Sequence, residues 1–189
     1  MTGPLYVVDE IGVTVNSVSN QILSTIQAND TAANGSTNIK AINYRYGHRL
    51  ELLETLKQMD ADPENKFLKF PLFYLVMDFI EQRGTKPGIY ARLGLNIVIA
   101  HQTEATFKIT DRYAKVFKPV LYPIYYSFME QLALQNGINE SDENLIEHTK
   151  IDRPYWGQNM KANLISDYVD AIELSNLGLL VNLKNCLTN

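Results

Sequence analysis

Side chains that could carry acid–base, nucleophilic or metal chemistry are few in this sequence and far apart. There are three histidines, His48, His101 and His148, and a single cysteine, Cys186. No HExxH or His-x-His pair is present, so the sequence predicts surface or capping roles for the histidines rather than metal ligation. Cys186 has no basic residue directly beside it to lower the pKa of its thiol, so we expect an inert thiol.

An enzymatic alternative comes from the expected order of elements: helix, strand hairpin, helix, strand. Many magnesium-dependent nucleases share this order and hold the metal with an Asp at a strand end and a Glu-x-Lys on the next strand. Asp78 ends a predicted strand, but the only Glu-x-Lys triplet, Glu64-Asn65-Lys66, precedes Asp78 in a turn. No GxSxG, GxxxxGK[ST] or GxGxxG motif occurs either. A divergent nuclease is therefore the weaker hypothesis, and we expect no catalytic residue, cofactor or metal.

One stretch combines bases with aromatic rings and could contact another macromolecule. Its members are Lys108, Arg112, Tyr113, Lys115, Phe117, Lys118, Tyr122, Tyr125 and Tyr126. Aromatic rings stack on nucleobases and lysines hold phosphates. However, 17 Lys+Arg against 21 Asp+Glu give a net charge of -4, which disfavours a dedicated nucleic-acid binder. We interpret the stretch as a helix with core aromatics and a solvated charged rim, and the eleven tyrosines of the chain suit protein interfaces.

The first 39 residues are expected to form a helical arm and a polar connector, separate from an α+β domain over 40–189. Apolar side chains recur there at spacings of three and four, which predicts a helix that buries one face. They are Val8, Ile11, Val15, Val18, Ile22 and Ile26. The following residues Asn29–Asn38 are small and polar, and we expect a loop.

The middle of the chain predicts a helix followed by a strand hairpin. Leucines predict a helix over 50–59, which ends before Asp62-Pro63 because the residue before proline avoids helical conformation. The apolar run 67–79 fits a strand covered on both faces, with Pro71 at an edge or bulge. After a turn over 81–88, strict alternation over 93–99 predicts a second strand, antiparallel to the first.

The last part of the chain predicts a helix and two more strands. Thr110-Asp111 can cap a helix that stops at Asn136-Gly137, and Pro119 either starts this helix or kinks it. Residues 139–147 are acidic and form either a solvated loop or a patch for a basic partner. A short strand is expected over 145–151.

The final strand, over 172–183, changes its alternation once at Ser175-Asn176, which indicates a bulge. Together these elements predict an α+β fold: one mainly antiparallel sheet with helices packed on one face and an N-terminal helical arm.

Segments that could direct the chain to a membrane are not evident. Apolar charge-free runs such as residues 119–129 and 70–77 fall well short of the roughly 20 apolar residues that a membrane helix needs. The first basic residue is Lys40, so the start lacks the charged region of a signal peptide. A single cysteine suits a reducing compartment. We expect a cytosolic or particle-borne protein.

Several segments resemble small structural proteins of tailed bacteriophages, and the order of elements is similar to that of the tail terminator (tail-completion) family. The segments are Tyr46-Gly47-His48, Phe70-Pro71-Leu72, Met77-Asp78-Phe79, the helix start over 117–125, Tyr155-Trp156-Gly157 and Asp170-Ala171-Ile172-Glu173. The resemblance covers about residues 40–185 and is one of topology more than of motifs. Residues 1–39 depart from the family's pattern and are interpreted as an arm that grips a neighbouring subunit.

The resemblance implies an α+β fold and a structural role in the virion without catalytic residues. It implies a ring of identical subunits, a hexamer, that caps the tail tube beneath the head–tail connector. The expected partners are further copies of the chain, the tail tube protein and neck or connector proteins, with no membrane and no sequence-specific nucleic acid. The expected location is the tail or neck of a virion assembled in the host cytoplasm. Another neck protein of the same particle is the nearest alternative.

Overall fold

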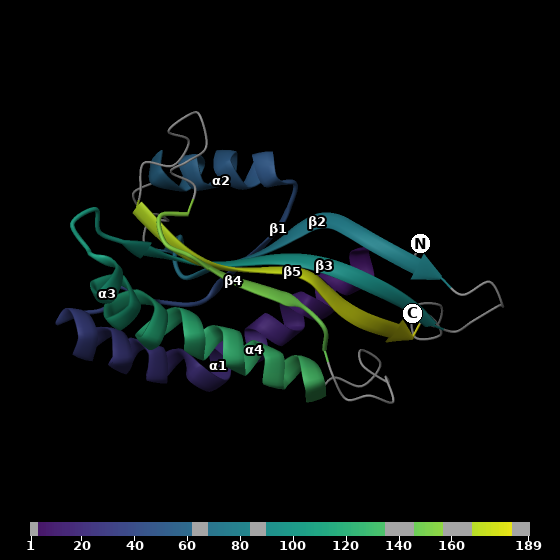
Figure 1. Ribbon diagram of the computed structural model, residues 1–189, viewed down its shortest axis with the longest axis horizontal. Coiled ribbons are helices and arrows are strands. Elements are labelled where there is room, and N and C mark those ends of the chain that lie inside the picture. Colours follow the sequence, from purple (N-terminus) through teal and green to yellow (C-terminus); the bar gives the residue numbers. More distant parts are fainter. Residues whose placement is uncertain (1–3, 62–67, 84–89, 135–145, 157–167, 183–189) are drawn as a thin grey trace.

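The structure is a computed structural model that describes residues 4–61, 68–83, 90–134, 146–156 and 168–182 (Figure 1). Its centre is a five-stranded sheet in the order β1-β2-β3-β5-β4. Only β1 and β2 run parallel; the other neighbours are antiparallel. The strands are β1 (Asn43–Gly47), β2 (Leu72–Arg83), β3 (Tyr90–Thr103), β4 (Thr149–Arg153) and β5 (Tyr168–Asn182).

Helices cover both faces of this sheet. On one face lie α1 and a continuous helical segment formed by α3, η2 and α4, and on the other face lies α2 (Figure 1). The helices are α1 (Pro4–Asn34), α2 (Arg49–Ala61), α3 (Ile109–Arg112), the π-helical stretch η2 (Tyr113–Leu121) and α4 (Tyr122–Leu134). The predicted α+β class, its mainly antiparallel sheet and the helix at the N-terminus are confirmed. The placement of α2 on the second face differs from the prediction that the helices pack on one face.

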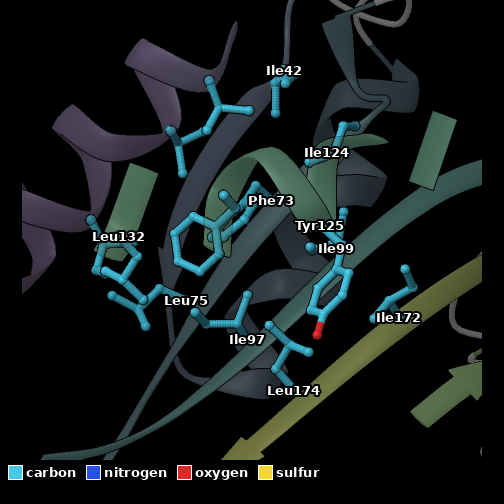
Figure 2. Close-up of a cluster of buried hydrophobic side chains, with 14 of the residues drawn as sticks. Ile42, Phe73, Leu75, Ile97, Ile99, Ile124, Tyr125, Leu132, Ile172 and Leu174 are labelled. Atoms are coloured by element: carbon cyan, nitrogen blue, oxygen red, sulfur yellow. The ribbon is translucent and has the colours of Figure 1, made fainter. Parts of the chain in front are cut away.

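The larger core fills the space between the sheet and the layer of α1, η2 and α4 (Figure 2). Residues of alternate positions on β3 and β5, such as Ile97, Ile99 and Ile172, point into it because strand side chains alternate between faces. The Phe73 ring of β2 meets the Phe128 ring of α4 with centroids 4.7 Å apart. Side-chain burial on this scale is the main stabilising contribution to the fold.

A smaller core lies on the opposite face, under α2. Leu52 and Leu56 of α2 pack with Leu72 of β2 and Val98 of β3. The first half of β2 is therefore buried on both faces, as its dense apolar run predicts. Pro71 lies one residue before β2, so its missing N–H interrupts no strand pairing. The Pro71 carbonyl accepts a hydrogen bond from the backbone N–H of Asn43 at 2.8 Å.

The N-terminal helix is longer than expected and packs into the larger core. The polar segment predicted as a loop from Asn29 is helical up to Asn34, which corrects that prediction. Ala28, Ala32 and Ala33 favour helix strongly. The Asn34 side chain also donates to the carboxylate of Asp30 and to the backbone oxygen of Lys115, so tertiary contacts hold the last turn. Five of the six predicted apolar positions are fully buried: Val8, Ile11, Val15, Val18 and Ile26.

The predicted antiparallel hairpin, formed by β2 and β3, and the predicted bulge of β5 are both present. Opposite β3, the pairing of β5 shifts register between Leu174 and Leu177, and Asn176 there has a φ of 53°. A second irregularity interrupts β2 between Val76 and Ile80. The turn predicted from 81 begins later, because β2 continues to Arg83.

Three further boundaries differ from the sequence prediction. The helical segment begins after Lys108 rather than at Thr110, because the carboxylate of Asp111 accepts a hydrogen bond from the Lys108 backbone N–H at 3.1 Å. Pro119 does not start the helix, which was one of the two alternatives, since it lies inside the π-helical stretch. Strand β1 was not predicted, and the short strand expected over 145–151 is β4, at Thr149–Arg153. The stop at 136–137 lies outside the described residues.

Candidate interaction surface

Three tyrosines form a ridge along the helical segment η2–α4. In this tyrosine ridge, the ring centroids of Tyr113 and Tyr122 are 5.8 Å apart and those of Tyr122 and Tyr126 are 6.1 Å apart. Tyr113 is 53% exposed and Tyr126 is 59% exposed. The ridge is a chain of three rings, exposed at Tyr113 and Tyr126 and half-buried at Tyr122, each packed against the next at an angle.

The π-helical stretch is what aligns these rings. Tyr113 and Tyr122 are separated by the nine-residue span of η2, and an α-helix turning about 100° per residue would place them on opposite sides. A π-helix bonds residue i to i+5 and so turns less per residue. The Tyr122 backbone N–H accordingly donates to the oxygen of Phe117, five residues earlier. The wider turn brings both rings to one face.

Strand β4 supports the middle of the ridge. The Tyr122 hydroxyl donates to Oδ2 of Asp152 at 2.7 Å, and the Lys150 ammonium lies 4.8 Å from the centroid of the Tyr122 ring. Lys150 also pairs with Oδ1 of Asp152. Burial, followed by the hydrogen bond to Asp152, raises the pKa of Tyr122 well above its ordinary value. The hydroxyl therefore stays protonated and holds the ring against β4.

His148 fixes the neighbouring Tyr125 rather than forming a reactive site. Its Nδ1 lies 2.9 Å from the backbone oxygen of Ile146, which only accepts, so the proton sits on Nδ1. The Nε2 atom then accepts from the Tyr125 hydroxyl at 2.8 Å. Burial raises the pKa of Tyr125, so this phenol remains the donor.

The basic and aromatic stretch divides into three groups in the structure. Phe117 and Tyr125 are core residues, as expected, and Lys118 belongs to an exposed rim. Tyr113 and Tyr126 are exposed rather than buried, which corrects the interpretation of the aromatics as core. Arg112 belongs to none of these three groups, because it is fully buried instead of lying in the charged rim.

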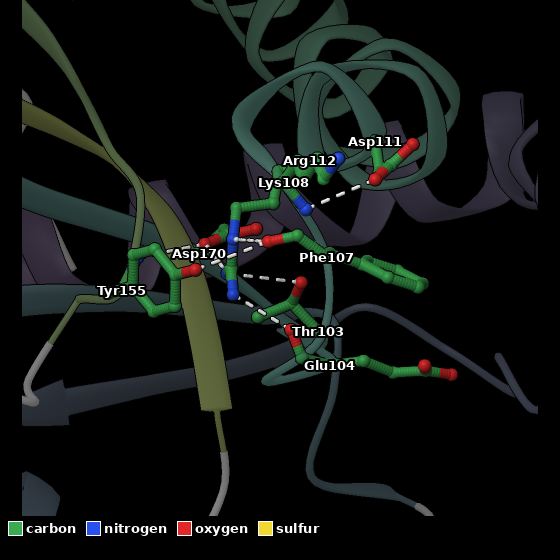
Figure 3. Close-up of polar contacts among 8 residues, drawn as sticks. All are labelled: Thr103, Glu104, Phe107, Lys108, Asp111, Arg112, Tyr155 and Asp170. Carbon is green, nitrogen blue, oxygen red and sulfur yellow. Dashed lines mark hydrogen bonds and ion pairs between the residues drawn. The ribbon is translucent and has the colours of Figure 1, made fainter.

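Arg112 is fully buried and forms the centre of a polar cluster (Figure 3). Its Nη1 donates to Oδ1 of Asp170 at 2.6 Å and to Oγ1 of Thr103 at 3.2 Å. Its Nε and Nη2 donate to the backbone oxygens of Phe107 and Glu104. The Tyr155 ring lies 3.4 Å from the guanidinium carbon, and the Tyr155 backbone N–H donates to the same Asp170 oxygen.

This cluster positions the start of the helical segment that carries the ridge. It ties the loop after β3, the first turn of the helix, the beginning of β5 and the residue Tyr155 after β4 to one guanidinium. Paired and hydrogen-bonded charges of this kind are tolerated in a core, whereas an unpaired one is strongly unfavourable. Local sequence carries no signal for the Arg112–Asp170 pair, because the two residues are 58 positions apart.

Beside the cluster lies His101, which pairs with Asp170 across β3 and β5. Its Nδ1 and the second oxygen of Asp170 are buried and have no hydrogen-bond partner among the described residues. Burial lowers the pKa of His101 to about 4, although Asp30 and Asp170 act in the opposite direction. His101 is therefore a neutral core residue at pH 7.

The other candidate residues are not brought together. His48 is exposed at the start of α2, and its backbone oxygen accepts the Tyr74 hydroxyl. Asp78 is exposed in the irregular part of β2. Glu64, Asn65, Lys66 and Cys186 lie outside the described residues. Within the described ranges, no group of three His, Cys, Asp or Glu side chains is placed to hold a metal ion.

The second feature of the surface is the outer edge of β2. Pairing with β1 ends at Val76, and in the part of the chain that the structure describes no strand pairs with this edge over residues 77–83. We call these residues the open edge of β2. Ile80 within it is 56% exposed. An unpaired edge with an exposed apolar side chain is a template for another chain.

Comparisons with known proteins give no relative: no family model matches the chain, and no curated protein or solved structure matches it significantly. Among the helices of the described ranges, none is long and apolar enough to span a membrane.

Proposed function

We propose that this chain is a structural subunit that assembles with copies of itself. In the fuller form of the proposal, it is a tail-terminator-like ring subunit of a phage particle, which caps the tail tube and docks to the head–tail connector. The open edge of β2 carries the proposal, because an unpaired strand next to a large sheet can extend that sheet into a neighbouring subunit. The resemblance of the segments between residues 40 and 185 supports the phage assignment.

The tyrosine ridge supports the same class of function. Tyrosine gives a large contact area and keeps a polar group for hydrogen bonding, and it is enriched in protein interfaces. The open edge of β2 and the separate aromatic surface of the ridge are two different patches. Two different patches on one subunit lead to head-to-tail contacts, which close into rings when the rotation permits. Another neck or connector protein of the same particle would use the same features.

Negative-stain microscopy and light scattering on the purified chain test this proposal. We expect closed rings, with six subunits as the expected number, or a mass that is a fixed multiple of 21.5 kDa. A monomer that cleaves DNA with Mg²⁺ would contradict the proposal, if cleavage is lost in Asp78→Ala. Ser175→Ala, a change at the other bulge of the sheet, is the matched control for nonspecific effects on the fold.

A further inference from the structure

The rings of the tyrosine ridge are arranged to meet a protein side chain rather than nucleobases. Tyr113 and Tyr122 lie at an interplanar angle of 72°, and Tyr122 and Tyr126 at 52°. Because neighbouring rings are so strongly tilted, they do not form parallel platforms on which successive bases could stack. Their exposed edges and hydroxyl groups form an uneven surface that fits an apolar side chain with polar neighbours.

The charge around the ridge favours an acidic partner. Lys118 is exposed on the π-helical stretch between Tyr113 and Tyr122, and Lys108 is exposed just before the helical segment. The Asp152 carboxylate, which touches the ridge, is already bonded to Tyr122 and Lys150. The complementary surface is therefore an exposed apolar residue flanked by carboxylates.

The open edge of β2 has this composition. Ile80 is exposed, and Asp78 and Glu81 beside it are exposed acidic residues. Ile80 pairs with Gly94 of β3, and Gly94 pairs with Gly178 of β5. A Cβ added at Gly94 would lie 3.6 Å from the Cβ of Ile80, so no side chain of β3 stands directly opposite Ile80. This leaves Ile80 available to a partner.

We propose that the tyrosine ridge of one copy binds the open edge of β2 of the next copy, with Ile80 against the rings and Asp78 near Lys118. The inference rests on the proposed function and names the two surfaces that meet. Because the ridge and the edge are different parts of the subunit, the contact is heterologous and repeats from copy to copy. The charge pair sets the orientation, and the buried isoleucine contributes most of the affinity.

Site-directed crosslinking tests the contact while keeping both surfaces intact. In a Cys186→Ser background, one cysteine is placed beside the ridge as Glu130→Cys and another beside Ile80 as Gln82→Cys. Both positions are exposed. The two proteins carry different tags, are mixed, and are treated with a short bismaleimide. The matched control pairs Glu130→Cys with Leu50→Cys, a residue that is 65% exposed on α2, which packs over the start of β2 rather than over its open edge.

We expect the Glu130→Cys and Gln82→Cys mixture to give about tenfold more mixed dimer than the control mixture. Adding Lys118→Glu to the ridge partner is expected to lower this yield about tenfold, and Asp78→Lys in the other partner is expected to restore it. Ile80→Ser is expected to abolish the product.

A yield equal to the control, or one that does not respond to these changes, would overturn the inference. Rings seen by microscopy without such crosslinks would leave the proposed function standing with a different interface. Absence of both rings and crosslinks would overturn both proposals.

Discussion

Arg112 and Asp170 lie 58 positions apart in the sequence and form a fully buried ion pair, with Nη1 and Oδ1 2.6 Å apart. The guanidinium also satisfies three neighbouring oxygen atoms and lies against the Tyr155 ring. The pair thereby connects the helix that carries the tyrosine ridge to strand β5 of the sheet. The pair holds the first turn of that helix against the sheet.

Replacing only one partner of the Arg112–Asp170 pair should strongly destabilise the folded protein. Arg112→Met leaves Asp170 buried without a counter-charge, and we expect the free energy of unfolding to fall by about 3–5 kcal/mol. Arg112→Met combined with Asp170→Leu removes both charges and should cost less than the sum of the two single changes. Urea denaturation of the three variants measures this coupling. Additive losses would show that the two charges do not depend on each other.

The stability of the protein should fall on mild acidification because of His101. Its pKa is about 4 in the folded protein against an ordinary 6.5, so the unfolded chain takes up the proton first as pH falls. Stability is therefore full above pH 6.5 and is lost progressively between 6.5 and 4, by roughly 1–3 kcal/mol. His101→Gln, compared with the wild type by denaturation at several pH values, should flatten the profile in this window. Equal slopes in both proteins would refute this role.

Tyrosine ionisation should report the contact between the ridge and β4. Asp152→Asn removes the negative charge that accepts the Tyr122 hydroxyl, so the pKa of Tyr122 should move down toward its ordinary value. Ultraviolet titration of tyrosinate would detect this as one additional residue ionising at lower pH. Tyr122→Phe provides the control, since in that background Asp152→Asn should leave the titration curve unchanged.

Replacing Gly12 of α1 with alanine should destabilise the protein, although alanine normally stabilises a helix relative to glycine. A Cβ at this position would lie 3.0 Å from Cε1 of Tyr44, whose hydroxyl donates to the backbone oxygen of Val8. Alanine usually stabilises a helix by about 1 kcal/mol relative to glycine. Because Tyr44 is held in place, we expect Gly12→Ala to lower the melting temperature. In a Tyr44→Ala background the same change should raise it, and stabilisation in both backgrounds would contradict the explanation.

The sequence predicts elements well where the signal is local. The broken alternation at Ser175-Asn176 locates the bulge of β5, because a strand that gains a residue must change the faces of the side chains that follow. Strand β1 was missed because Asn43–Gly47 has no clear alternation and its parallel partner is distant in the chain. The loop predicted over 29–38 begins only after Asn34, because contacts of Asn34 with Asp30 and Lys115 extend the helix.

The candidate surface was harder to predict than the fold. The tyrosines were recognised as a group, but the net negative charge of the chain favoured an interpretation in which they belong to the core. A regular α-helix would divide Tyr113 and Tyr122 between opposite sides, so the ridge depends on the π-helical stretch. The open edge of β2 depends on where β1 ends, and that element was not predicted. Asp152 and Lys150, which support the ridge, lie on a strand that meets the helix only through tertiary folding.

The π-helical stretch makes the ridge depend on the number of residues between its tyrosines. Related chains that keep the ridge should show tyrosines in the pattern Tyr-x8-Tyr-x3-Tyr, with a proline six positions after the first, rather than an α-helical repeat. A lineage that lost one residue between Tyr113 and Leu121 would rotate Tyr122 and Tyr126 about 100° away from Tyr113 in one step. The ridge would then disappear through a single deletion, without any tyrosine being replaced.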